Sequence, residues 1–121
     1  MAIEPNTRIY SVNEVDEHLP TMRAFLLGAV RSWTKNRPEE VFALRNLVGG
    51  ENWDWDGTPL MPLFTKHERK GKNNEQAMAD AAKDAGWILK AILADDNRTY
   101  QVSDAGLTNG YLLIQSEQNN G

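Results

Sequence analysis

Apolar side chains recur at helical spacing along the N-terminal third of the chain. Ser11 and Glu14, a hydroxyl followed three residues later by a carboxylate, have the spacing of a capping box, which marks a helix start. Proline disrupts a helix interior but fits the first turn, so Pro20 divides the stripe. We therefore predict a short helix ending near His18 and a longer one over residues 20–35. The apolar positions of the stripe are Val12, Val15, Leu19, Met22, Phe25, Leu26, Ala29, Val30 and Trp33.

Two further helix starts follow. Residues 36–40 combine a capping side chain, an early proline and two acids, which suit the positive end of a helix. The helix they begin is expected to stop at Gly49 and Gly50, because glycine tolerates a left-handed cap. Thr58 and Pro59 have the residue types of an N-cap and first position, which predicts a third helix reaching about His67. The buried face expected for the second helix is Val41, Phe42, Leu44, Leu47 and Val48.

An alanine-rich segment predicts a fourth helix with Asn73 or Asn74 as its N-cap. Gly86 is expected to end this helix. Residues 87–93 are short, apolar and bounded by Gly86 and the polar residues 95–97, which predicts a strand. A continuing helix is the alternative, because leucine, lysine and alanine are good helix formers. The apolar face of the fourth helix comprises Ala77, Met78, Ala81, Ala82 and Ala85.

The remaining segments complete an antiparallel sheet. Residues 98–103 alternate polar and apolar side chains after the turn at 95–97, as a half-buried strand does. Residues 110–115 predict a last strand or a short helix, and residues 116–121 a flexible tail. The pattern therefore predicts an α+β protein with about four helices followed by a small antiparallel sheet. We expect a single domain over residues 1–121, with an N-terminal helical segment at 1–36 and the rest of the fold at 37–115.

Composition narrows the function. The chain has 121 residues, enough for one domain to bury a core without metals or disulfides, and it has no cysteine. No stretch approaches the ~18 apolar residues of a membrane span, and the N-terminus lacks a secretion signal. We therefore expect a cytoplasmic protein without a membrane partner. A net charge of −4 disfavours indiscriminate nucleic-acid binding, because lysine and arginine supply most of that affinity.

Candidate catalytic and metal-binding motifs are incomplete. Residues 52–57 match the first half of a calcium-binding loop, but the twelfth position, which should be glutamate, is Leu63. His18 and His67 lack the spacing of a zinc site. The sequence contains no phosphate-binding glycine motif and no nucleophile elbow. We therefore expect no cofactor, no metal, no catalytic residues and no enzymatic activity.

Two segments carry a resemblance to a known family. Residues 82–88, AKDAGWI, and residues 95–106, DDNRTYQVSDAG, resemble the winged helix-turn-helix regulators of the MarR and PadR kind. The resemblance covers mainly residues 58–106 and implies a winged-helix-like domain, in which a recognition helix is followed by a two-stranded wing. That arrangement depends on Gly86, because residues 87–93 can return as a strand only if the helix ends there.

The resemblance implies a DNA-binding transcriptional regulator. Its recognition helix, residues 74–85, would enter the major groove, where side-chain amides can bond adenine. A cationic link would clamp phosphates, since four cations against Glu68 give residues 66–72 a net charge of +3. Such domains usually pair through terminal helices, so a homodimer through the N-terminal helices is expected. The implied DNA-binding residues are Lys66, Arg69, Lys70, Lys72, Asn73, Asn74, Gln76, Lys83, Lys90 and Arg98.

A protein-interaction module on the same scaffold, without DNA binding, is the alternative. The expected recognition helix is acidic, because Glu75, Asp80 and Asp84 outnumber Lys83. Trp53 and Trp55 have the same parity, so in an extended segment they would face one way and could bind a partner. Plugging a small core is the competing role for this pair. A small-molecule-binding or enzymatic role would instead require a large apolar pocket lined by acids with perturbed pKa values.

Overall fold

The computed structural model describes residues 12–49, 54–105 and 108–115. Within them the chain forms four α-helices followed by a two-stranded antiparallel sheet, which confirms the predicted α+β fold class. This order, in which the helices precede a β-hairpin, is winged-helix-like. The elements are the 3-10 turn η1 (Asp16–His18), α1 (Leu19–Asn36), α2 (Leu44–Val48), α3 (Met61–Glu68), α4 (Asn74–Asp95), β1 (Thr99–Ala105) and β2 (Thr108–Gln115).

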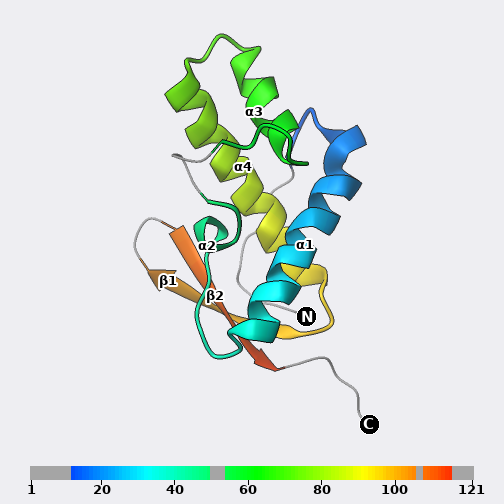
Figure 1. Ribbon diagram of the computed structural model, residues 1–121, viewed down its shortest axis with the longest axis vertical. Helices are drawn as coiled ribbons and strands as arrows, with labels where there is room; N and C mark the ends of the chain where they lie inside the picture. Colours follow the sequence, from blue (N-terminus) through cyan, green and yellow to red (C-terminus); the bar gives the residue numbers. More distant parts are fainter. Residues whose placement is uncertain (1–11, 50–53, 106–107, 116–121) are drawn as a thin grey trace.

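The long helix α4 is the central element of the fold. α1 runs beside it, and α3 folds back against its N-terminal part, while the hairpin lies towards its other end (Figure 1). Each of these elements contributes side chains to one hydrophobic core. The core residues that show no exposed surface include Met22, Leu26 and Val30 of α1, Leu63 of α3, Ala81, Ala85 and Leu93 of α4, and Phe42 and Tyr100.

The predicted helix end at Gly86 is wrong, and so is the strand over residues 87–93. α4 passes through Gly86 and continues to Asp95. The physical reason is that Ile88, Leu89 and Leu93 extend the buried stripe of the first half of the helix at helical spacing. Glycine within a helix costs about 1 kcal/mol relative to alanine. Burying each of those three side chains contributes about 1.5–3 kcal/mol, so burial outweighs the glycine.

Replacing Gly86 with alanine tests this helix directly. A Cβ at Gly86 meets nothing within 4 Å, so we expect Gly86→Ala to raise the free energy of unfolding. The gain should be about 0.5–1 kcal/mol in urea denaturation followed by circular dichroism. Gly71→Ala is the matched control: its Cβ also meets nothing, but its φ of +89° should make alanine destabilising there. A loss of stability in Gly86→Ala would place Gly86 at a left-handed helix end instead.

The second helix is shorter than predicted. The start signal at residues 36–40 does not begin a helix; α1 runs to Asn36, and α2 begins only at Leu44. Phe42 instead forms an antiparallel bridge with Tyr111 of β2. The amide of Phe42 donates to the Tyr111 carbonyl at 2.8 Å, and the reverse bond measures 2.7 Å. This long-range pairing holds the backbone of Phe42 extended, which delays the start of α2.

Several helix boundaries agree with expectation. The long first helix is confirmed as α1, although only η1 forms in place of the short helix before it. The third helix is confirmed as α3, but its predicted start is wrong, since Leu60 is the N-cap and Thr58 and Pro59 lie in the turn before it. The N-cap of the fourth helix is confirmed, since the Asn73 side chain accepts a bond from the Gln76 amide at 2.8 Å. The predictions for Ser11, Gly50, Trp53 and residues 116–121 lie outside the described residues.

The sheet confirms the two expected strands after α4. β1 and β2 pair antiparallel, with Tyr100 opposite Leu113 and Val102 opposite Tyr111, and the register shifts between Thr99 and Tyr100. The second strand resolves the strand-or-helix alternative for residues 110–115 in favour of the strand. Tyr100 and Tyr111 are buried, so the hairpin closes one end of the core.

Candidate functional site

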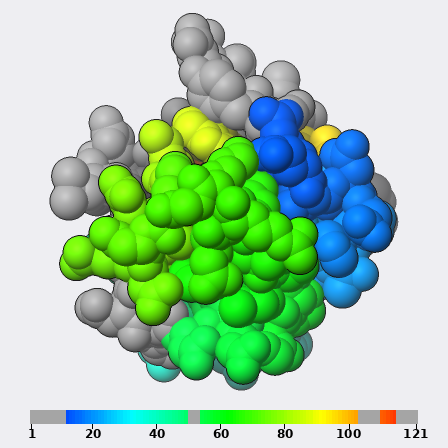
Figure 2. Space-filling view, turned by 90° about the horizontal axis from the view of Figure 1, so that it is seen from above, coloured from blue at the N-terminus to red at the C-terminus, as the bar shows by residue number. Residues whose placement is uncertain are grey.

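The basic residues between α3 and α4 lie at one end of the molecule. Figure 2 views this end: residues of α3, the link and the start of α4 (green) form much of its surface, beside the segment that leads into α1 (blue). Lys70 Nζ lies 2.6 Å from Glu14 Oε1, and Lys72 forms an ion pair with Asp80. Lys66 Nζ donates to the Asn13 carbonyl at 2.7 Å. Lys66, near the end of α3, and Lys70, in the link, therefore hold the segment before α1 in place.

These ion pairs favour the charged form of the acids. The hydrogen bond from Lys70, and then its charge, lowers the pKa of Glu14 below its ordinary value. The hydrogen bond from Lys72 likewise lowers the pKa of Asp80, against a smaller effect of burial. Each lysine thus has an internal carboxylate partner where a DNA-binding surface would need it for a phosphate.

Lys66 belongs to a partly buried cluster that the sequence did not indicate. Lys66 Nζ and His67 Nε2 lie 2.9 and 2.8 Å from the same Oδ2 atom of Asp84. His67 is buried, and its Nδ1 has no hydrogen-bond partner among the described residues. Asp84 of α4 therefore contacts two consecutive residues of α3, and this cluster holds the two helices together. Spacing along the sequence carried no sign of this contact, because it depends on how α3 packs on α4.

Two more of the implied DNA-binding residues are buried. Lys90 shows 8% of its surface, and its Nζ lies 5.3 Å from the centre of the Trp87 ring. Arg98 also shows 8%, and it donates to the Tyr100 hydroxyl at 2.6 Å and to Thr34 Oγ1 at 3.1 Å. Neither cation is placed to reach a DNA backbone from this arrangement.

Asp96 is the acceptor at the centre of the Arg98 network. Its side chain is only 2% exposed, accepts a hydrogen bond from the Tyr100 hydroxyl and pairs with Arg31 at 2.8 Å and Arg98 at 3.4 Å. Burial alone would raise the pKa of Asp96, but the Tyr100 hydrogen bond and both guanidinium charges together lower it. Burial, and then the bond to Asp96, raises the pKa of Tyr100 well above its ordinary range. The network joins α1, the end of α4 and β1.

The other implied DNA-binding residues divide into two groups. Asn73 serves as the N-cap of α4, so its side-chain oxygen is already engaged. Arg69, Asn74, Gln76 and Lys83 are exposed. Of the ten residues, these four keep side chains on the surface without an ion pair or buried role among the described contacts. They include two cations, Arg69 and Lys83, of the seven among the ten residues.

A groove opens between α3 and the start of α4. It has a volume of about 420 Å³, and Met61 and Phe64 of α3 face Met78 of α4 across it. Met61 and Phe64 are partly exposed, whereas Met78 is 6% exposed. Polar side chains at the margin come from the preceding loop and from the first turn of α4. The lining residues are Asp54, Trp55, Met61, Phe64, Asn74, Glu75 and Met78.

Trp55 supports this groove from beneath. It is 3% exposed, and its indole Nε1 donates to the Val48 carbonyl at 3.0 Å. The expectation that Trp55 projects from the surface as a partner-binding residue is therefore wrong, and the competing role in the core is confirmed. Turn hydrogen bonds cause this, since the Trp55 carbonyl accepts from Thr58 N at 2.9 Å, so the segment is not extended. Trp53 lies outside the described residues.

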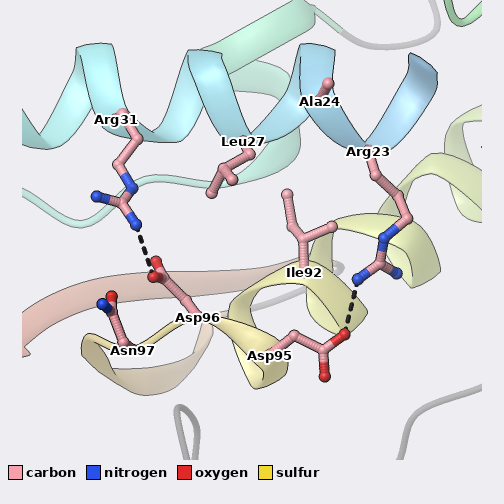
Figure 3. Close-up of a pocket in the computed structure, with 8 residues that line it drawn as sticks. All are labelled: Arg23, Ala24, Leu27, Arg31, Ile92, Asp95, Asp96 and Asn97. Carbon is pink, nitrogen blue, oxygen red and sulfur yellow. Dashed lines mark hydrogen bonds and ion pairs between the residues drawn. The ribbon is translucent and has the colours of Figure 1, made fainter. Parts of the chain in front are cut away.

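A second depression lies between α1 and the end of α4. In Figure 3, Arg23 and Arg31 reach down from α1 to Asp95 and Asp96, on either side of an apolar floor that includes Leu27. The Arg23–Asp95 pair measures 2.7 Å and is exposed, whereas Asp96 belongs to the buried network. The charges at this depression are thus mutually neutralised, unlike those of the α3–α4 groove.

The apolar stripe expected to form a dimer interface is used within the chain. Val12, Val15, Met22, Leu26 and Val30 are all buried in the core. Dimerisation through these side chains would therefore require the core to open. A homodimer stays a prediction, but these five side chains are not available for it.

Neither a metal-binding cluster nor a membrane-spanning helix is found among the described residues. No group of three histidine, cysteine or acidic side chains there could hold a metal ion. None of the helices in that part is long and apolar enough to cross a membrane. No family model, curated protein or solved structure matches this chain. The resemblance to the MarR and PadR regulators therefore stays a prediction.

Proposed function

We propose that the protein is a small, non-enzymatic, cytoplasmic interaction module that binds a segment of a partner protein in the α3–α4 groove. The observation that carries the proposal is that Met61 and Phe64, both partly exposed, line one groove with the buried side chains of Trp55 and Met78. Aromatic residues and methionine are enriched where proteins bind one another. Methionine also adapts its shape to different side chains, which suits it to a binding surface.

The charges support a protein partner over DNA. Lys66, Lys70 and Lys72 pair with internal acids, and Lys90 and Arg98 are buried. Phosphate contacts would have to break those pairs, whereas the groove can be filled without disturbing them. The continuous helix through Gly86 also removes the strand on which the predicted wing depended. The alternative reading of the sequence thus receives the stronger support.

Selection from a random peptide display library tests this function. We expect the wild-type protein to enrich a related set of peptides, and Phe64→Ala to lose most of their binding, because interface aromatics supply a large share of affinity. Binding is then measured for synthetic peptides by fluorescence anisotropy. Leu27→Ala is the matched control, since Leu27 is equally a partly buried side chain, but one that lines the second depression.

The fold of each variant is checked by circular dichroism. If Phe64→Ala is unfolded, Met61→Gln makes the same test, because Met61 is partly exposed at the first position of α3. The absence of any enriched peptide contradicts the proposal. Equal losses in Phe64→Ala and Leu27→Ala contradict it as well, since they would place the binding elsewhere.

DNA binding is a second candidate, favoured by one observation. Arg69, Asn74 and Gln76 are exposed together at the junction of α3 and α4, where a recognition helix would begin. Anisotropy of a labelled duplex over a salt series tests it, with Arg69→Ala and Lys83→Ala as variants. Binding that weakens with salt and with both variants supports DNA binding, and no binding at low salt contradicts it.

A further inference from the structure

We propose that the occupant of the α3–α4 groove is a cationic amphipathic helix, an inference that rests on the function proposed above. Apolar side chains of the partner would fill the groove, and its lysine or arginine side chains would lie near the acidic residues at the groove margin.

The groove margin is negative. Asp54 and Glu75 are exposed, and they come from two separate segments, the loop before α3 and the first turn of α4. Among the described residues that line the groove there is no lysine or arginine. Among the nearby cations, Lys66, Lys70 and Lys72 pair with carboxylates of the protein, whereas Arg69 is exposed but does not line the groove. A charged partner therefore meets two carboxylates without a compensating cation at the groove.

The lining contributes side chains and no strand edge. Met61 and Phe64 lie one turn apart on α3, and Glu75 and Met78 lie one turn apart on α4. A peptide added as a strand needs a row of unpaired backbone groups, which two helices do not supply. An amphipathic helix instead binds through apolar side chains spaced by three and four residues, and it fits a groove between helices. Among peptide-binding modes, this one matches the lining.

The size of the groove sets what it can hold. A volume of about 420 Å³ is suited to a few aliphatic or aromatic side chains from one face of a helix. The polar face of that helix then lies at the margin, near Asp54 and Glu75. Lysine or arginine at its edges would gain from both carboxylates, while glutamate or aspartate would be repelled. The whole chain, with its net charge of −4, adds a weaker attraction in the same direction.

Two labelled peptides of about 18 residues test the proposal. Both carry leucine at the same helical positions; one has lysine on the polar face and the other has glutamate. We expect the lysine peptide to bind the wild-type protein at least about tenfold more tightly by anisotropy at low salt. Its affinity should fall as salt is added, because exposed charges are screened. Phe64→Ala should weaken the lysine peptide.

Substitution of the margin locates the charge effect. The double variant Asp54→Asn with Glu75→Gln should weaken the lysine peptide roughly threefold to tenfold and leave the protein folded, because both side chains are exposed. The control double variant, Glu17→Gln with Glu39→Gln, removes the same charge from exposed positions away from the groove. We expect it to change the affinity less than twofold, about the size of a distant, screened effect.

Each outcome decides the proposal. Equal affinity for the two peptides, lost in Phe64→Ala, overturns the cationic specificity and leaves the groove as a binding site. Equal weakening in both double variants reduces the effect to net charge and overturns it too. If selected peptides bind but the lysine peptide does not, the helical class is wrong. If no peptide of any kind binds, the proposed function itself fails.

Discussion

Replacing Asp96 with alanine is expected to lower the free energy of unfolding by about 3–5 kcal/mol at neutral pH. The carboxylate is 2% exposed and is the shared partner of Arg31, Arg98 and the Tyr100 hydroxyl. Its removal leaves the buried guanidinium of Arg98 without its carboxylate partner, and an uncompensated buried charge is costly. Urea denaturation followed by far-ultraviolet circular dichroism measures the change.

Asp95 provides the matched control for Asp96. It is the neighbouring acid and also pairs with an arginine of α1, but its side chain is 71% exposed. Asp95→Ala should therefore change the free energy of unfolding by less than about 1 kcal/mol. Similar losses in the two variants would contradict the buried network, because they would show that burial does not separate these acids.

The pH dependence of the free energy of unfolding provides a second test of the Asp96→Ala variant. The pKa of Asp96 is lower in the folded protein than its ordinary 3.8, so the unfolded chain binds the proton first as the pH falls. Its stabilisation is therefore present above the pKa of the unfolded chain and is lost as the pH falls through the folded pKa. The difference between wild type and Asp96→Ala should narrow below about pH 4. Glu14 and Asp80 titrate alike in both proteins and cancel from the difference.

Replacing Trp55 with alanine is expected to cost about 3–5 kcal/mol of stability, as for other buried tryptophans. The indole is 3% exposed and packs under the α3–α4 groove, so its loss leaves a cavity beneath Met61 and Met78. The Val48 carbonyl also loses its indole donor. The loss of stability should therefore be measurable by urea denaturation of the protein alone, without a partner.

Trp55→Phe separates the two contributions. The ring of phenylalanine retains much of the packing, but it cannot donate to Val48, so a loss of about 1–3 kcal/mol is expected. A cost below about 1 kcal/mol for Trp55→Ala would show that the side chain lies on the surface, as one reading of the sequence proposed.

Local sequence signals predicted the presence of the helices and strands better than their boundaries. The role of Asn73 as N-cap of α4 was predictable because it depends on a hydrogen bond between residues close in sequence, and the structure shows this bond from the Gln76 amide. The helix end predicted at Gly86 was wrong because glycine costs a helix only about 1 kcal/mol, which is less than the gain from burying Leu89 and Leu93. Those two residues continue the spacing of Ala81 and Ala85, so the signal for a longer helix was present in the stripe itself.

The site depended on contacts between distant segments. Lys70 donates to Glu14, which lies 56 residues away in the sequence, and Arg98 donates to Thr34, which lies 64 residues away. A count of charges over residues 66–72 therefore suggested a free cationic patch, whereas tertiary pairing neutralises much of it. Trp55 illustrates the same limit, since the parity argument assumed an extended segment where turn bonds to Thr58 bend the chain.

The unbroken helix has a consequence for what the molecule can do at once. At 1.5 Å per residue, the 22 residues of α4 measure about 33 Å from end to end, comparable to the diameter of a small domain. Glu75 and Asp96 are therefore separated by nearly the whole body of the protein. A short ligand seated near the first turn leaves the far end of this rod, and the hairpin beside it, open to another molecule.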